Sequence, residues 1–111
     1  MTETSNDILI SDVTLRDGNH AISHQMTKEQ IISYCDAADA AGISIVEVGH
    51  GNGLGASSLQ VGESALADKI MLPIAREHLK KSKLGIHVIP GFATIERDLK
   101  PAIDYGVDVF R

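Results

Sequence analysis

A short polar segment near the N-terminus combines three side chains that can do chemistry. Arg16, Asp17 and His20 lie within five consecutive residues, and Gly18 between them permits a tight backbone bend. The Asp17 carboxylate can serve as an oxygen ligand of a hard divalent cation. The Arg16 guanidinium can stabilise an oxyanion or enolate, and the His20 imidazole can act as a general base. The ordinary alternative is an arginine–aspartate surface pair beside a solvated histidine.

The second candidate segment is glycine-rich and extends over residues 49–62. It contains His50, which shapes the rim of an active site or simply belongs to a loop. Residues 51–56 also match the G-x-G-x-x-A pattern of dinucleotide-binding modules. Residues 57–62, however, stand where the helix of such a module should begin, and residues 86–94 lack the acidic side chain that would bind a ribose. A dinucleotide-binding module is therefore the weaker alternative.

The remaining histidines and the single cysteine have ordinary interpretations. We expect His24 to be exposed at the entry to a helix, although a supporting role at the site is an alternative. His78 lies among charged residues on a solvated helix face. His87 alternates with apolar residues of a strand, which favours a buried histidine with satisfied hydrogen bonds. Cys35 lies on an apolar helical stripe and is expected to be an unreactive core thiol.

Four apolar runs predict the strands that must position these residues. They cover residues 8–15, 44–48, 84–89 and 107–110. A first helix should begin after Thr27, because Thr27 and Gln30 form a capping-box pattern, and should end near Gly42. A second helix is expected over residues 68–82, with its first turns disturbed by Pro73.

The start of a third helix depends on Pro101. If Thr94 were the N-cap, Pro101 would lie in the helix interior, whereas after an Asp98 cap it is the third helical residue. A proline costs little in the first turn, because the N–H that it lacks has no partner there. We therefore expect Asp98 to cap this helix and Gly106 to end it.

Strands that alternate with helices are parallel and joined by right-handed crossovers. Two α/β architectures fit this pattern, namely an open doubly wound sheet and the N-terminal half of a TIM (β/α)8 barrel. A barrel needs about 250 residues, or ~31 for each strand–helix unit. We therefore expect residues 1–111 to form a single partial domain, the N-terminal part of such a barrel.

The composition limits the class of protein. Of the 111 residues 43% are apolar, and fifteen acidic against ten basic residues give a formal charge of −5. This acidic balance argues against nucleic acid and anionic membrane surfaces as partners. No apolar run approaches the ~18–20 residues of a bilayer span. One cysteine cannot form an intrachain disulfide, so we expect a cytoplasmic protein.

Two motifs resemble a known enzyme superfamily. Residues 12–18, Asp-Val-Thr-Leu-Arg-Asp-Gly, resemble the signature that ends the first barrel strand of the DRE-TIM metallolyases. His20, in a position where acyl-CoA-condensing members usually have glutamine, makes the segment similar to the 4-hydroxy-2-oxovalerate aldolase branch. Residues 47–58, Glu-Val-Gly-His-Gly-Asn-Gly-Leu-Gly-Ala-Ser-Ser, are similar to a second motif of that branch, and the Pro90-Gly91 turn is a weaker third match.

The resemblance implies a divalent-metal-dependent class II pyruvate aldolase. Such an enzyme cleaves 4-hydroxy-2-oxoacids, for example 4-hydroxy-2-oxopentanoate, to pyruvate and a short aldehyde such as acetaldehyde in the catabolism of aromatic hydrocarbons. The resemblance makes Asp17 a ligand of Mn²⁺ or Mg²⁺ and a substrate-binding residue. It makes Arg16 the residue that binds substrate and stabilises the enolate, and His20 the base that takes the hydroxyl proton. It also implies an acylating aldehyde dehydrogenase as partner.

The same resemblance places the other metal ligands in a His-x-His pair on a later strand. This chain has five histidines and no His-x-His pair, so we expect the 111 residues alone to be inactive. An acyl-CoA-condensing synthase or lyase of the same superfamily is the nearest alternative. A third possibility is a natural truncation that persists as a non-catalytic interaction domain and associates through its open sheet edges.

Overall fold

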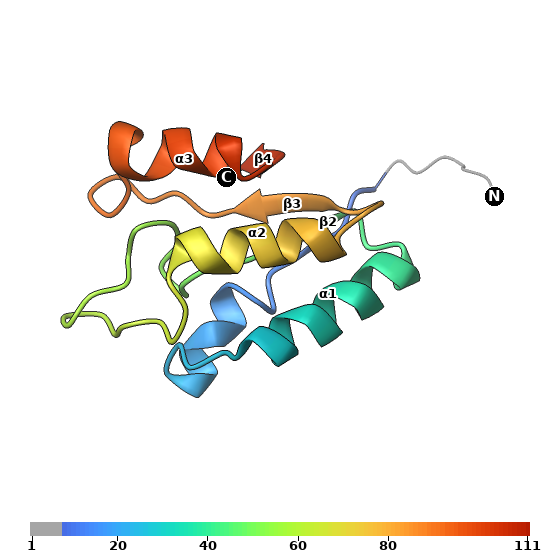
Figure 1. The fold of residues 1–111 in the computed structure, drawn as a ribbon, viewed down its shortest axis with the longest axis horizontal. Helices are drawn as coiled ribbons and strands as arrows, with labels where there is room; N and C mark the ends of the chain where they lie inside the picture. The colour runs from blue at the N-terminus through green and yellow to red at the C-terminus, as the bar shows by residue number, and fades with distance from the viewer. Residues whose placement is uncertain (1–7) are drawn as a thin grey trace.

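Four parallel strands and the helices between them make up residues 8–111, the part of the chain that the computed structural model describes (Figure 1). The strands are β1 (Ser11–Asp12), β2 (Ile45–Glu47), β3 (Lys83–Ile86) and β4 (Val109–Phe110). They lie side by side in the order β1-β2-β3-β4. A doubly wound sheet would reverse this order at a switch point. The steady advance in one direction confirms the predicted N-terminal half of a TIM barrel, with its helices on one face.

The first helix, α1 (Lys28–Ala41), begins and ends where the sequence predicts. The Gln30 N–H donates to the Thr27 hydroxyl over 3.2 Å, and the Thr27 N–H donates to the Gln30 side chain over 2.9 Å. These reciprocal bonds satisfy two N–H groups that a bare helix end leaves unpaired. Gly42 ends the helix in the left-handed conformation, with φ of 81°.

The second helix, α2 (Asp68–His78), ends before the predicted Ser82. The Asp39 carboxylate of α1 accepts hydrogen bonds from the N–H groups of Lys81 and Ser82, over 2.7 and 2.8 Å, and so draws these residues out of the helix. The prediction that Pro73 disturbs the helix is wrong, because α2 continues through it. Pro73 lies on the exposed face, where water can bond the carbonyl that loses its partner.

The predicted Asp98 cap of the third helix is also wrong. A π-helical turn, η2 (Ile95–Leu99), begins after Thr94 and runs into α3 (Lys100–Asp104). The Leu99 N–H donates to the Thr94 carbonyl five residues back, over 3.0 Å. This wider turn ends just before Pro101, so the helix accommodates a residue without an N–H. Asp98 lies inside the turn, and its carboxylate accepts the Thr94 N–H over 2.9 Å.

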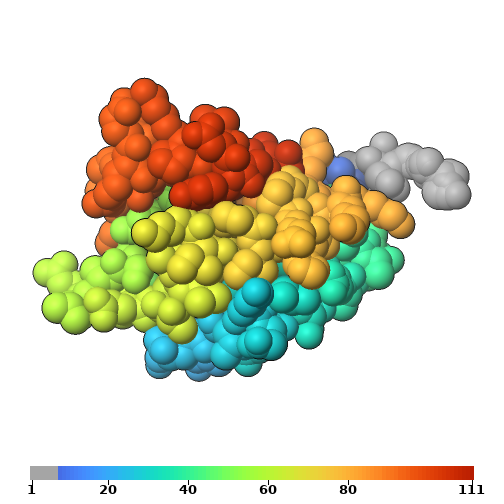
Figure 2. All heavy atoms as spheres, in the orientation of Figure 1, coloured from blue at the N-terminus to red at the C-terminus, as the bar shows by residue number. Residues whose placement is uncertain are grey.

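The core lies between the sheet and the helices. Fully buried members come from α1, α2, β2, β3 and α3 and include Ile31, Met71, Leu72, Val46, Leu84 and Ala102. Figure 2 shows α3 and β4 packed along one side of α2, while part of the segment between β2 and α2 projects at one end of the molecule. None of the helices in residues 8–111 is long and apolar enough to cross a bilayer.

Candidate active site

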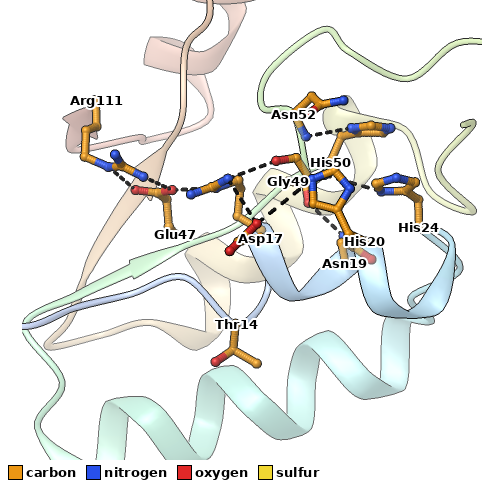
Figure 3. A network of polar contacts seen from close by, with 12 residues as sticks. Thr14, Asp17, Asn19, His20, His24, Glu47, Gly49, His50, Asn52 and Arg111 are labelled. Atoms are coloured by element: carbon orange, nitrogen blue, oxygen red, sulfur yellow. Dashed lines mark hydrogen bonds and ion pairs between the residues drawn. The ribbon is translucent and has the colours of Figure 1, made fainter. Parts of the chain in front are cut away.

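The candidate residues of the first polar segment lie just beyond the carboxyl end of β1. The predicted strand 8–15 is shortened to Ser11–Asp12, because the N–H groups of Arg16, Asp17 and Gly18 all turn back to the Val13 carbonyl. A short 3₁₀ helix, η1 (Asp17–Ile22), then carries Asp17 and His20. The segment that follows β2 lies against this helix, so the two sequence motifs meet at one edge of the sheet (Figure 3).

Glu47, at the end of β2, holds an arginine on each side. Arg16 Nε donates to Glu47 Oε1 over 2.7 Å, while Arg111 donates through Nε to Oε2 over 2.8 Å and through Nη2 to Oε1 over 3.0 Å. Only 1% of Glu47 is exposed. Burial acts to raise the pKa of this carboxyl, but the hydrogen bonds from Arg111 and Arg16 outweigh it and lower the pKa. Glu47 is therefore an ionised, fully paired carboxylate.

Arg16 is fixed at two points and keeps a cationic edge toward Asp17. Its Nη1 donates to the Gly51 carbonyl over 2.9 Å and lies 3.8 Å from Asp17 Oδ1. The Asp17 side chain is 59% exposed and the His20 ring 45% exposed, and the nearest atoms of the two lie 4.0 Å apart. The structure thus brings a fixed cation, a carboxylate and an imidazole together, while the roles of Arg16, Asp17 and His20 in catalysis stay predictions. These groups together can bind an anionic substrate and move one proton.

The side chains at this position can supply one ligand to a divalent cation. Asp17 has an exposed carboxylate whose contacts with Arg16 and His20 are long, 3.8 and 4.0 Å, and an oxygen of this kind suits Mn²⁺ or Mg²⁺. Within residues 8–111, no group of three His, Cys, Asp or Glu side chains is arranged to hold a metal ion. The described residues therefore supply Asp17 as a single candidate ligand.

Behind His20 lie two further histidines, and both are buried (Figure 3). The expectation that His24 is exposed is wrong, because only 6% of it is accessible. The preceding η1 turns it inward, and its ring stacks on that of His50 with 3.6 Å between ring centroids. His50 is completely buried in the segment that follows β2, and its role at the rim of the site stays a prediction. Asn19 adds a bond from Nδ2 to the Gly49 carbonyl over 2.7 Å.

The predictions for His87 and Cys35 have different outcomes. His87 Nδ1 is buried and has no hydrogen-bond partner among the described residues, so the expectation of a satisfied histidine is wrong. Burial, followed by the charges of Arg16 and Arg111, lowers the pKa of His87 and favours its neutral form. Cys35 is completely buried in the core, as predicted, and burial raises the pKa of its thiol to about 12.

The glycine-rich segment has the wrong geometry for a dinucleotide. Twenty residues, 48–67, separate β2 from α2, so no helix begins at the glycines. The N–H groups of the segment are already engaged in hydrogen bonds within the protein. Gly53 donates to the His50 carbonyl, Leu54 to the His87 carbonyl and Gly55 to the Asp68 carboxylate. A phosphate cradle needs such N–H groups free. The structure therefore argues against the dinucleotide-binding alternative.

Sequence reasoning missed Glu47, Asn19 and Arg111 as members of the site. Glu47 carried a usable signal, because it is a carboxylate within a run of β-branched residues that forms a buried strand. Asn19 looked like an ordinary turn residue, and Arg111 joins the site only because β4 packs beside β3. Neither of these two positions stands out from its neighbours in the sequence.

Comparisons with known proteins extend over nearly the whole chain. The model of the family described as HMGL-like matches residues 7–105. A protein named 4-hydroxy-2-oxovalerate aldolase from Spirochaeta aurantia is 66% identical over 104 residues, which are 94% of this chain and 30% of that protein. Proteins of Pectobacterium atrosepticum, with the same name, and Salinispora arenicola, named 4-hydroxy-2-oxovalerate aldolase 2, are 60% and 58% identical over 94% and 92% of the chain. The chain spans about 30% of the length of these relatives.

Proposed function

The chain belongs to the HMGL-like family, and from this premise we propose that the protein is a pyruvate aldolase acting on 4-hydroxy-2-oxoacids. The names of its relatives support 4-hydroxy-2-oxopentanoate as the substrate, with pyruvate and acetaldehyde as products. One observation carries the proposal. Arg16, held by Glu47 and the Gly51 carbonyl, faces the same space as Asp17 and the accessible His20 ring.

In this proposal His20 takes the proton of the substrate C4 hydroxyl. As that oxygen becomes the aldehyde carbonyl, the C3–C4 bond breaks, and its electron pair passes into the enolate of pyruvate. A proton returned to C3 completes pyruvate, so the reaction needs neither an oxidant nor a reductant. Arg16 binds the substrate and stabilises the negative charge on the enolate oxygen. Removal of a preorganised donor of this kind typically costs about 10²–10³-fold in rate.

We further propose that Asp17 binds Mn²⁺ or Mg²⁺ and, with it, the substrate. A divalent cation at this position would act as a Lewis acid toward the 2-oxo and carboxylate oxygens of the substrate. Asp17 would supply one oxygen ligand, with the Arg16 Nη1 atom 3.8 Å from its carboxylate. The ligands that complete the coordination sphere would lie outside residues 8–111.

The partner and the location are also proposals. An acylating aldehyde dehydrogenase would remove the aldehyde, and a cytoplasmic location would suit this reaction. Nucleic acid is not proposed as a partner, since the chain carries a formal charge of −5.

The test is retro-aldol cleavage by the purified native protein with Mn²⁺. Pyruvate formed from 4-hydroxy-2-oxopentanoate is measured by coupling to lactate dehydrogenase and following NADH absorbance. We expect turnover that stops when EDTA removes the metal, and a loss of about 10²–10⁴-fold in kcat for His20→Ala. His78→Ala is the matched control, because His78 lies on the outer face of α2 beside Asp36. Absence of pyruvate, or equal kcat for His20→Ala and the wild type, would refute the proposal.

A further inference from the structure

The two buried histidines behind His20 have no role in the reaction proposed above. We propose that the stacked pair of His24 and His50 is a positioning element, which holds the Gly51 peptide and through it both His20 and Arg16. This inference rests on the proposed aldolase function, because the position of His20 matters only if that ring moves a proton.

His50 anchors the pair to the backbone. Its Nδ1 accepts the Asn52 N–H over 2.9 Å, so the ring proton is on Nε2, which donates to the Gly62 carbonyl over 2.9 Å. The ring is completely buried and uses both nitrogens. His50 is therefore a neutral imidazole in a fixed tautomer and orientation.

His24 transmits this fixed orientation to Gly51. Its ring lies 3.6 Å from the His50 ring, between centroids, with an interplanar angle of 11°, and its Nδ1 accepts the Gly51 N–H over 3.3 Å. Nδ1 can accept only when it carries no proton. Burial, followed by the nearby His50 and His20, lowers the pKa of His24 and favours the neutral ring, and the contact with the Gly51 N–H selects the tautomer with its proton on Nε2.

The strained backbone conformation at His24 supports the positioning role, because the fold alone does not require this strain. Ser23 and His24 both have positive φ, 53° and 62°, in the left-handed region that residues other than glycine rarely occupy. Such conformations are unfavourable for residues other than glycine and persist where the surrounding structure enforces them. The Ala65 N–H donates to the His24 carbonyl over 2.9 Å, so the segment before α2 helps to hold this strained turn.

Gly51 is the point at which the positioning pair meets both residues of the proposed chemistry. Its carbonyl accepts the Arg16 Nη1 bond over 2.9 Å. A Cβ atom at Gly51 would lie 2.4 Å from His20 Nε2, so the His20 ring rests directly on the bare Cα of this glycine. Gly51, held through its N–H by His24, therefore sets the guanidinium and the imidazole relative to each other through its carbonyl and its bare Cα.

Two substitutions at position 24 separate hydrogen bonding from packing. His24→Phe keeps a flat ring that can stack on His50 but removes the acceptor for the Gly51 N–H. His24→Asn loses the ring but keeps an oxygen close to the position of Nδ1, and asparagine tolerates the left-handed backbone. We expect kcat to fall on the order of 10²-fold in the phenylalanine variant with little change in KM, because Glu47 still holds Arg16. The asparagine variant should stay within about threefold of the wild type.

The second readout is amide hydrogen exchange over residues 49–56 of the native protein, followed by mass spectrometry. We expect protection of the Gly51 amide in the wild type, its loss in His24→Phe and its return in His24→Asn. A wild-type Gly51 amide that exchanges as fast as a free loop overturns the inference even if both variants misfold. Equal kcat in wild type and His24→Phe, or equal losses in both variants, overturns it as well. A wild type that forms no pyruvate refutes the proposed function instead, and the exchange experiment still tests the pair.

Discussion

At the scale of single residues, Glu47 ties together parts of the chain that are far apart. It accepts bonds from Arg16, 31 residues earlier, and from Arg111, 64 residues later. A buried carboxylate is stable only when its lone pairs are filled, and here two guanidinium groups fill them. Glu47 touches no reacting atom in the proposed mechanism, so we regard it as a positioning residue for Arg16.

The first prediction concerns the substitution Glu47→Gln. We expect it to lower the free energy of unfolding by about 3 kcal/mol, the lower end of the cost of breaking a buried ion pair, because Arg111 is half exposed. The value of kcat/KM should fall as well, since Arg16 loses its anchor. Urea denaturation and the pyruvate assay measure the two effects. Glu63→Gln is the control, because Glu63 is exposed, and similar values for both variants would contradict the prediction.

The second prediction concerns acid stability. The pKa of Glu47 is lowered in the folded state, so below about pH 4.5, its ordinary value, the unfolded chain takes up a proton first. The stabilisation that ionised Glu47 contributes is therefore fully present above about pH 4.5. As the pH is lowered below this value, the free energy of unfolding decreases until the pH has passed the folded-state pKa of Glu47. Thermal melts between pH 6 and pH 3 should show this loss. Glu47→Gln should have a shallower acid dependence, and an unchanged slope would argue against the assignment.

At the scale of elements, local signals fixed α1, while a contact with another helix decided the end of α2 and a local π turn decided the start of α3. The α1 capping box lies within four consecutive residues, so the sequence alone predicts it. The end of α2 depends on Asp39, which belongs to another helix. The π turn before Pro101 escapes a sequence-based prediction, because the rules for N-caps and prolines assume regular α-helical geometry.

The third prediction concerns the start of α1. Thr27→Ala removes the hydroxyl that accepts the Gln30 N–H, and we expect it to lower the free energy of unfolding by about 1 kcal/mol. Thr94→Ala is the matched control, because Thr94 precedes η2 but caps no N–H with its side chain. Urea denaturation of both variants gives the comparison. A Thr94→Ala cost as large as that of Thr27→Ala would show that the hydroxyl cap is not the cause.

At the scale of the whole molecule, the strand order places all catalytic candidates at the carboxyl ends of the strands. The carboxyl ends of β1 and β2 bring Arg16 to Glu47, and β4 brings Arg111 to the same carboxylate. The same strand order also leaves two lateral edges of the sheet, at β1 and at β4, that no described strand covers. Beside β1, Ile8 and Leu9 are 77% and 70% exposed, and Ile103 and Phe110 are exposed beside β4.

The fourth prediction concerns residues 1–111 expressed by themselves. We expect this polypeptide to associate, because its open edges and apolar side chains can pair with those of other copies. It should also release no pyruvate with Mn²⁺, since the described residues supply one candidate metal ligand. Size-exclusion chromatography and the pyruvate assay test both expectations. A compact monomer would contradict the first, and turnover above buffer would contradict the second.

The sequence by itself determined what is encoded within a few neighbouring residues. The alternation of apolar runs and helices, the Thr27 cap and the arginine–aspartate–histidine segment all follow from local spacing and side-chain chemistry. Parallel strands followed as well, because alternating strands and helices leave few allowed connections, but the alternation fitted both a doubly wound sheet and a half-barrel until the strand order separated them.

Only the tertiary structure decided which distant groups meet. The pairing of Glu47 with Arg111, the burial of His24 against His50 and the unpartnered nitrogen of His87 depend on how separate elements pack. Glu47 meets Arg111, 64 residues away, and His24 meets His50 across 26 residues, separations that no local pattern records. A buried polar group must find its partner in three dimensions, and the fold, not the spacing along the chain, supplies it.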